Sequence, residues 1–210
     1  EVLLLDEPFG ALDARVRAEL RQWLRRLHDE QGLTSVFVTH DQQEAFELAD
    51  RVVVMDHGAV QQEGTPTEIF DAPANPFVLD FVGEANPVQG TVRDRAVRLG
   101  ALAVPADHLA EGTAVRGGIR SFELKFWAEE PGIATVQRML ALGDRVRVEV
   151  AVAGGPELIG QFPRRSSLLH GVEPGRRVAI EVTRAHLYPQ AGGLVVAGPE
   201  SPQFSRGAGA

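Results

Sequence analysis

The sequence contains no cysteine, and only one of its 21 basic residues, Lys125, is a lysine. The absence of cysteine excludes disulfide bonds, thiolate metal ligands and thiol nucleophiles, and it fits a reducing compartment. The 29 acidic residues outnumber the basic ones, and the formal net charge of -8 argues against a nucleic-acid-binding groove. No apolar run approaches the roughly 20 residues that a membrane-spanning helix needs. We therefore expect no nucleic-acid partner and no spanning helix, although the chain can still dock on a membrane protein.

Hydrophobic residues make up 44% of the sequence and charged residues 24%, close to the averages of folded soluble proteins. A length of 210 residues suits two small domains, since typical domains have roughly 100–150 residues. The pattern of apolar residues changes near residue 86. We expect an α/β domain over residues 1–85, a small all-β domain over residues 86–190 and a flexible tail over residues 191–210.

The first part alternates short apolar runs with an amphipathic helix. The runs at Val2–Leu5 and Val36–Val38 have the pattern of strands buried on both faces of a parallel sheet. Between them we expect a helix that Asp13 caps, that ends near Gly32 and that packs Trp23 in the core. Its apolar stripe consists of Val16, Leu20, Trp23, Leu24 and Leu27. The alternation predicts parallel strands joined by right-handed crossovers.

Further elements follow before residue 86. Asp41 and Glu44 stand at capping-box spacing before a second helix. The stretch RVVVMDHGAVQQEG predicts a strand, a tight turn at His57-Gly58 and a second strand. A short helix around Pro66–Phe70 completes this part, and three prolines then indicate a boundary.

The second part consists of short alternating segments separated by glycine and proline, which is typical of a small β-barrel or sandwich. Two of them, GTAVRGGIRSFEL and GRRVAIEVTRAHL, align with Gly112 on Gly175 and Leu124 on Leu187. Either duplicated barrel halves or a chance similarity of alternating strands explains the match. Four histidines stand singly on expected turns and edges, and we assign them no function: His57, His108, His170 and His186.

Two adjacent carboxylates, Asp6 and Glu7, follow the first apolar run. Ligands of open α/β sheets bind outside the carboxyl ends of the strands. In P-loop NTPases the acid that ends such a strand holds Mg²⁺, usually through water. Glu7 could accept a proton from water that attacks a γ-phosphate. Alternatively, the pair only begins a loop, with Pro8 ending the strand.

His40 is the last residue of SVFVTH, and it has the same position relative to its strand as Asp6 has relative to VLLL. If the two strands are parallel neighbours, Asp6, Glu7 and His40 share one edge of the sheet. A histidine there can hydrogen-bond a terminal phosphate and sense whether it is present. A single histidine at a strand end is more often only a loop residue. A carboxylate pair together with such a histidine indicates a phosphate-binding site more specifically than either feature alone.

LLLDEPFGALD followed by SVFVTHDQQEA resembles the nucleotide-binding subunits of ABC transporters. By that resemblance Asp6 is the Walker B aspartate, Glu7 the catalytic base, Gly10–Asp13 the D-loop and His40 the switch histidine. Gly10 departs from the family pattern, which often has serine there. The resemblance implies the C-terminal part of a P-loop ABC domain, with ATP and Mg²⁺ as cofactors held by Asp6 and Asp13. It also implies a homodimer that sandwiches ATP.

The sequence contains no G-x-x-x-x-G-K-[ST] motif, and the LSGGQ signature and glutamine loop of the family are missing too. The resemblance places all three motifs upstream of Glu1. We therefore expect the full-length protein to hydrolyse ATP as a dimer and the 210-residue chain to be inactive by itself.

NPFVLDFVGEANPVQGTV and the β segments after it resemble the importer branch whose ATPases carry a C-terminal TOBE-type, OB-like barrel. FVGEANPVQGTV and LALGDRVRVEV are most similar to the sulfate and thiosulfate ATPases. The resemblance implies a peripheral protein on the cytoplasmic face of the bacterial cell membrane. Its partners would be integral-membrane permease subunits and, indirectly, a periplasmic or extracellular solute-binding protein. Molybdate, iron, sugars and polyamines remain alternative solutes.

Two other classes of function stay open. The chain could be a non-catalytic module whose β domain senses an oxyanion or a partner, with the α/β part as a dimerisation platform. Arg164-Arg165 and Arg176-Arg177 suit an oxyanion, although solvated charges at β edges explain them more simply. The third class is a soluble ABC ATPase acting on DNA or ribosomes, which the acidic charge and the β domain disfavour.

Overall fold

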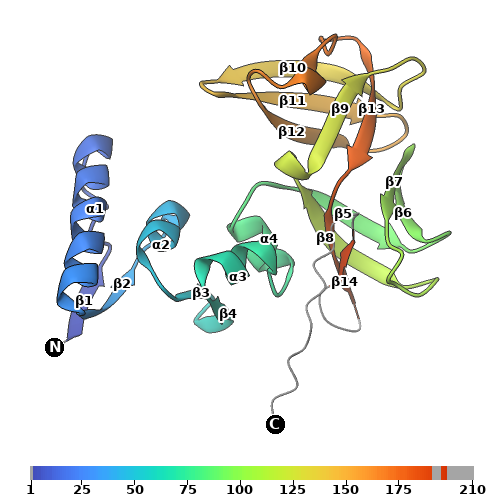
Figure 1. The fold of residues 1–210 in the computed structure, drawn as a ribbon. Helices are drawn as coiled ribbons and strands as arrows, with labels where there is room; N and C mark the ends of the chain where they lie inside the picture. Colours follow the sequence, from blue (N-terminus) through green and yellow to red (C-terminus); the bar gives the residue numbers. More distant parts are fainter. Residues whose placement is uncertain (1, 191–194, 198–210) are drawn as a thin grey trace. The chain divides into compact units, whose positions relative to one another are not determined.

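The structure is a computed structural model, and it describes residues 2–190 and 195–197. It divides into two compact units, residues 1–72 and 73–210 (Figure 1). This division lies upstream of the boundary expected after residue 85, so helix α4 (Pro76–Phe81) belongs to the second unit. The expected flexible tail lies outside the described residues, apart from the short strand β15 (Val195–Ala197).

The first unit begins with two parallel strands and the helix that connects them. Strand β1 (Val2–Asp6) pairs with β2 (Thr34–Val38), with Asp6 opposite Val38. Helix α1 (Ala14–Gln31) lies between them in the chain and beside them in space (Figure 1). The structure thus has the predicted parallel pairing for β1 and β2, whereas the other sheets in the described residues are antiparallel.

Helix α1 begins and ends where the sequence predicts. The Asp13 carboxylate accepts hydrogen bonds from the N–H groups of Arg15 (3.0 Å) and Val16 (3.1 Å), which are otherwise unpaired in a first turn. Gly32 ends the helix with a φ of 61°, which glycine adopts without steric cost. The prediction that Trp23 packs in the core is wrong, because its side chain is 51% exposed. Trp23 lies at the margin of the apolar stripe, next to the polar face of the helix.

The prediction that the apolar runs are buried on both faces is also wrong. Side chains alternate between the two faces of a sheet, and one face of the β1–β2 pair is open in the described part of the chain. The residues on this face, each more than half exposed, are Val2, Leu4, Val36 and Val38. On the other face Leu3, Leu5 and Phe37 are half-buried.

Helix α2 (Gln42–Leu48), strands β3 (Val52–Asp56) and β4 (Ala59–Gly64) and helix α3 (Pro66–Asp71) complete the first unit. The β3–β4 hairpin turns at His57-Gly58, where both residues have positive φ, 46° and 78°. A two-residue turn with positive φ at both positions matches the twist of paired strands. The predicted hairpin and final short helix are confirmed.

The second unit consists of antiparallel strands, with α4 in contact with β8. One sheet has the order β12-β11-β10-β13-β9, a second has the order β15-β14-β8-β5, and β6 and β7 form a hairpin. The predicted small β domain is confirmed. Its remaining elements are β5 (Ala85–Thr91), β6 (Ala96–Leu99), β7 (Leu102–Pro105), β8 (Ala114–Arg120), η1 (Ser121–Glu123), β9 (Leu124–Ala128), β10 (Ala134–Leu142), β11 (Arg145–Val152), β12 (Glu157–Pro163), η2 (Ser167–Leu169), β13 (Arg177–Val182) and β14 (Ala185–Pro189).

The chain crosses between the two larger sheets twice, from β8 to β9 and from β13 to β14. At the crossings Glu123 Oε1 lies 3.1 Å from His186 Nε2, and the Thr183 hydroxyl donates to the Glu123 carbonyl oxygen at 2.8 Å. His186 is 0% exposed, so the expectation that it stands on a turn or edge is wrong. Glu123 and His186 occupy the same place in the two aligned segments. This equivalence favours duplicated halves over chance similarity.

Tyr188 is buried, and its hydroxyl donates to the carbonyl oxygen of Pro73 at 2.9 Å. Burial raises the pKa of the Tyr188 phenol well above its ordinary value of about 10. Stability that depends on the neutral phenol is therefore fully present below about pH 10 and is lost as the pH rises further.

In urea denaturation we expect the free energy of unfolding to fall more steeply above about pH 10 for the wild type than for Tyr188→Phe. Equal slopes would contradict this prediction.

Candidate functional site

Glu7 and His40 meet at the carboxyl ends of the two parallel strands. Asp6 ends β1, and the N–H of Glu7 donates to the carbonyl oxygen of Val38 at 2.9 Å. His40 follows the end of β2, and its Nδ1 lies 3.2 Å from Glu7 Oε1. Parallel strands end at the same edge of a sheet, where ligands of α/β folds bind. The side chains of Glu7 and His40 are 56% and 77% exposed, so both are accessible to a bound molecule.

The backbone at Glu7 has a φ of 43°, in the left-handed region that residues other than glycine seldom adopt. Such a conformation costs about 1–3 kcal/mol and persists where surrounding contacts impose it, often at functional sites. Here the contacts come from the loop itself. Gly10 N–H donates to the Glu7 carbonyl oxygen at 3.2 Å, and Phe9 is only 1% exposed. The loop therefore holds the Glu7 backbone in a strained conformation.

Three residues around His40 fix the start of helix α2. The Asp41 carboxylate accepts the Gln43 N–H at 2.8 Å, which caps the helix. The predicted capping box takes a different form, because Glu44 accepts a hydrogen bond from the Thr39 hydroxyl at 2.5 Å. The Thr39 hydroxyl in turn accepts the Asp41 N–H at 3.0 Å. Glu44 is only 4% exposed, so this relay anchors both neighbours of His40.

A pocket opens beside the Glu7–His40 contact. Its lining residues are Glu7, Gly10, Arg17, Thr39, His40, Asp41 and Glu44. An accessible carboxylate can accept a proton from water, and an imidazole beside it can hydrogen-bond a phosphate oxygen. The pocket thus combines a candidate base with a candidate phosphate ligand. The sequence did not point to Arg17, Thr39 or Glu44 as parts of this site.

The other two predicted site residues, Asp6 and Asp13, do not line this pocket. Asp6 is exposed at the end of β1, and the carboxylate of Asp13 caps helix α1. The described residues contain no group of three or more His, Cys, Asp or Glu side chains that could hold a metal ion. Mg²⁺ in nucleotide sites needs only one or two carboxylates, completed by water and phosphate oxygens. A single carboxylate such as Asp6 fits that mode.

The arginine pairs of the β domain are exposed. Arg177 Nε donates to the carbonyl oxygen of Gly132 at 3.0 Å, and Arg164 Nη1 donates to that of Gly143 at 3.3 Å. These guanidinium groups bind backbone carbonyls of their own domain, which favours the simpler interpretation as surface charges at β edges. Within the described ranges, we find no helix whose length and apolar character would suit a membrane span.

Comparison with protein-family models matches residues 128–188 to the TOBE domain. Sulfate/thiosulfate import ATP-binding protein CysA 1 of Chromobacterium violaceum is 48% identical over 202 residues, which cover 91% of this chain and 56% of that protein. The CysA proteins of Burkholderia pseudomallei and Thermosynechococcus vestitus are 47% and 44% identical, covering 79% and 90% of this chain and 49% and 54% of those proteins. The chain thus spans about half the length of these relatives.

These matches cover both units of the chain, because alignments over about nine-tenths of its length must include residues of each. They confirm the resemblance that the motifs around Glu7 and His40 indicated. The chain is therefore a homologue of the ATP-binding proteins of sulfate and thiosulfate import, and it carries a TOBE domain in its C-terminal part.

Proposed function

We propose that this chain is the C-terminal part of the ATP-hydrolysing subunit of an ABC importer. Residues 1–85 would be the end of a P-loop nucleotide-binding domain with a parallel sheet, and residues 86–190 a regulatory OB-like domain. The observation that carries the proposal is the 3.2 Å contact between Glu7 and His40 at the ends of two parallel strands. The homology to ATP-binding proteins supports it.

In the proposed mechanism, Glu7 accepts the proton of the water that attacks the γ-phosphate. His40 hydrogen-bonds that phosphate and orients Glu7 through the contact between Nδ1 and Oε1. Asp6 would hold Mg²⁺ through water, and Asp13 would contact nucleotide from the D-loop. Bound Mg²⁺ would neutralise charge on the phosphates. The chain's own contribution is to place a base and a hydrogen-bonding imidazole side by side.

The proposed assembly is a dimer of ATPase subunits on integral-membrane permease subunits, at the cytoplasmic face of the bacterial membrane. A periplasmic or extracellular solute-binding protein would deliver the solute. ATP would lie between two copies of the full-length subunit. Hydrolysis is therefore expected of the full-length dimer and not of the 210-residue chain alone.

The proposed solutes are sulfate and thiosulfate, as the names of the relatives suggest. In a strain that lacks the full-length protein, we expect uptake of radiolabelled sulfate and thiosulfate to be lost and to return with the wild-type gene. Uptake of molybdate, iron, sugars and polyamines should be unchanged. If uptake of one of those solutes is lost instead, that solute is the substrate. If uptake of every solute tested is unchanged, the importer role is contradicted.

A further inference from the structure

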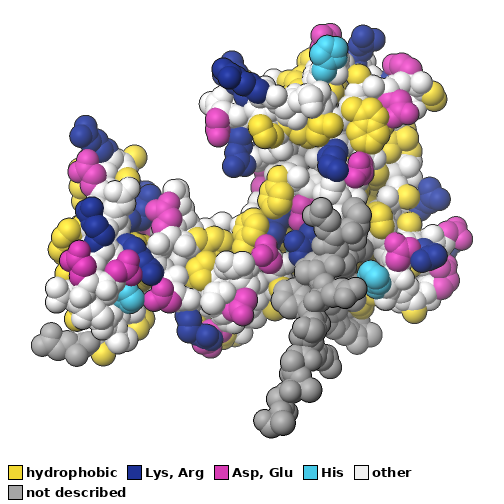
Figure 2. All heavy atoms as spheres, viewed as in Figure 1, with side chains coloured by type: hydrophobic (Ala, Val, Ile, Leu, Met, Phe, Trp, Pro, Cys, Tyr) yellow, Lys and Arg dark blue, Asp and Glu magenta, His cyan; other side chains and the backbone are white. Residues whose placement is uncertain are grey.

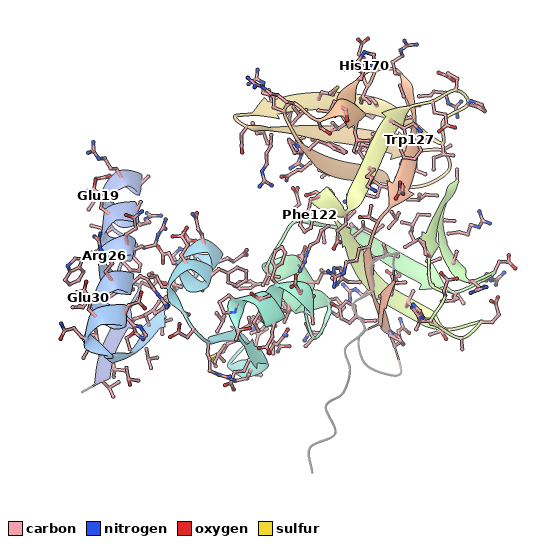
Figure 3. All side chains as sticks on the ribbon, in the orientation of Figure 1. Glu19, Arg26, Glu30, Phe122, Trp127 and His170 are labelled. Carbon is pink, nitrogen blue, oxygen red and sulfur yellow. The ribbon has the colours of Figure 1, made fainter. Side chains whose placement is uncertain are left out.

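Helix α1 presents a row of arginines to helix α2 and the loops beside it. Arg17, Arg21 and Arg25 are spaced by four residues, which places them on one face of the helix. Arg21 Nε lies 2.9 Å from Glu47 Oε2, and Arg25 Nη1 lies 2.9 Å from Asp50 Oδ1. The outer side of α1 instead carries exposed charged residues of both signs (Figures 2 and 3). Those labelled there are Glu19, Arg26 and Glu30.

Arg17 differs from the other two because its partners lie in the two loops that carry Glu7 and His40. Its Nη2 donates to the carbonyl oxygen of Leu12 at 3.0 Å, in the loop that follows Glu7. Its Nη1 lies 3.9 Å from Oδ2 of Asp41, the residue after His40. One half-buried side chain therefore bridges both loops.

We propose that Arg17 is a positioning residue that fixes the separation of Glu7 and His40. A guanidinium is planar, always charged and donates from several nitrogens in a fixed geometry, so it can hold two acceptors at once. The expected effect of Arg17 on hydrolysis rests on the proposed function, whereas its expected effect on the two loops does not. Arg17 also lines the pocket beside Glu7 and His40, but its polar contacts are with Leu12 and Asp41, and it acts through them.

The hold on Asp41 extends to His40 through the contacts already described. The Asp41 N–H donates a hydrogen bond to the Thr39 hydroxyl, which donates one to the buried Glu44 carboxylate. His40 thus lies between two residues that are each fixed to the start of α2. Without Arg17 this rigid group loses its side-chain link to Leu12 in the loop after β1, and the remaining links are the Glu7 N–H bond to Val38 and the Glu7–His40 contact itself. The distance between Glu7 and His40 would then vary more widely.

Arg21 provides a matched control on the same face of the same helix. It is 8% exposed, and its partner Glu47 lies in α2 rather than in either loop. Replacing Arg21 removes a comparably placed arginine, and its ion pair with Glu47 (2.9 Å) is closer than that of Arg17 with Asp41 (3.9 Å). A general loss of α1–α2 packing should therefore affect Arg21→Met at least as much as Arg17→Met.

The test compares Arg17→Met, Arg17→Lys and Arg21→Met in the full-length protein. We expect Arg17→Met to lower kcat for ATP hydrolysis by about 10- to 100-fold, since small misplacements of catalytic groups cost that much. KM for ATP should change by less than about threefold, because the nucleotide contacts remain. The kcat of Arg17→Lys should lie between those of the wild type and Arg17→Met, since lysine donates from a single nitrogen. Arg21→Met should keep the wild-type kcat.

Hydrogen–deuterium exchange of the same variants reports on the loops independently of activity. We expect faster exchange of residues 7–13 and 39–44 in Arg17→Met and not in Arg21→Met. Equal loss of kcat in both variants, or unchanged exchange in Arg17→Met, would overturn the proposal. If the wild-type protein does not hydrolyse ATP, the proposed function fails and the exchange comparison alone decides the role of Arg17.

Discussion

Replacement of Glu7 by glutamine in the full-length protein should slow ATP hydrolysis by about 10²- to 10⁴-fold, the usual contribution of a general base. The amide has nearly the shape of the carboxylate but cannot accept the proton of the attacking water. The backbone contact of Glu7 with Val38 does not involve the side chain, so the loop should keep its conformation. We therefore expect ATP binding to persist while turnover is lost.

Single-turnover hydrolysis and nucleotide titration measure the two parts of this prediction separately. Glu19→Gln is the matched control, because it removes the same charge from an exposed position on α1 that is paired with Arg15. The control should hydrolyse ATP at the wild-type rate. Wild-type hydrolysis by Glu7→Gln would show that another group acts as the base.

Gly117→Ala should destabilise the second unit by at least about 3 kcal/mol, the upper part of the range for overpacked sites. Gly117 pairs with Leu187 between strands β8 and β14. A Cβ atom at this position would overlap the carbonyl oxygen of His186. The obstacle is backbone in a paired strand and cannot rotate away, so relief requires the two strands to separate. This separation would also disturb the contact of His186 with Glu123.

Urea denaturation of the 210-residue chain, followed by signals from the β domain, measures this effect. Gly83→Ala is the control within the same unit. Its Cβ would meet only side-chain atoms of Arg120, at 3.6 and 3.8 Å, which are ordinary contact distances. A similar free energy of unfolding for both variants would contradict the packing that we describe.

Features set by a few neighbouring residues could be predicted from the sequence. Asp13 and Gly32 mark the ends of α1 through capping chemistry that acts within one turn. The His57-Gly58 turn is likewise local. The Glu7–His40 contact could also be anticipated, because parallel pairing brings the residues after two strand ends to one edge.

Features that depend on distant residues could not be predicted in the same way. The bridge from Arg17 to Asp41 joins two separate elements, and nothing in the periodicity of α1 specifies its partner. Burial of His186 depends on a crossing strand, although its alignment with Glu123 was a usable signal. Helical spacing places Trp23 on the apolar stripe of α1, but it does not predict whether other elements bury a residue at the margin of that stripe.

The central claim is that Glu7 and His40 act as one catalytic unit, and a double-mutant cycle tests it most directly. Single-turnover ATP hydrolysis would be measured for the full-length wild type, Glu7→Gln, His40→Ala and the double variant. Residues that act as a unit have strongly non-additive effects. We predict that the double variant is no slower than the slower single variant. Losses that multiply, as for independent residues, would contradict the claim.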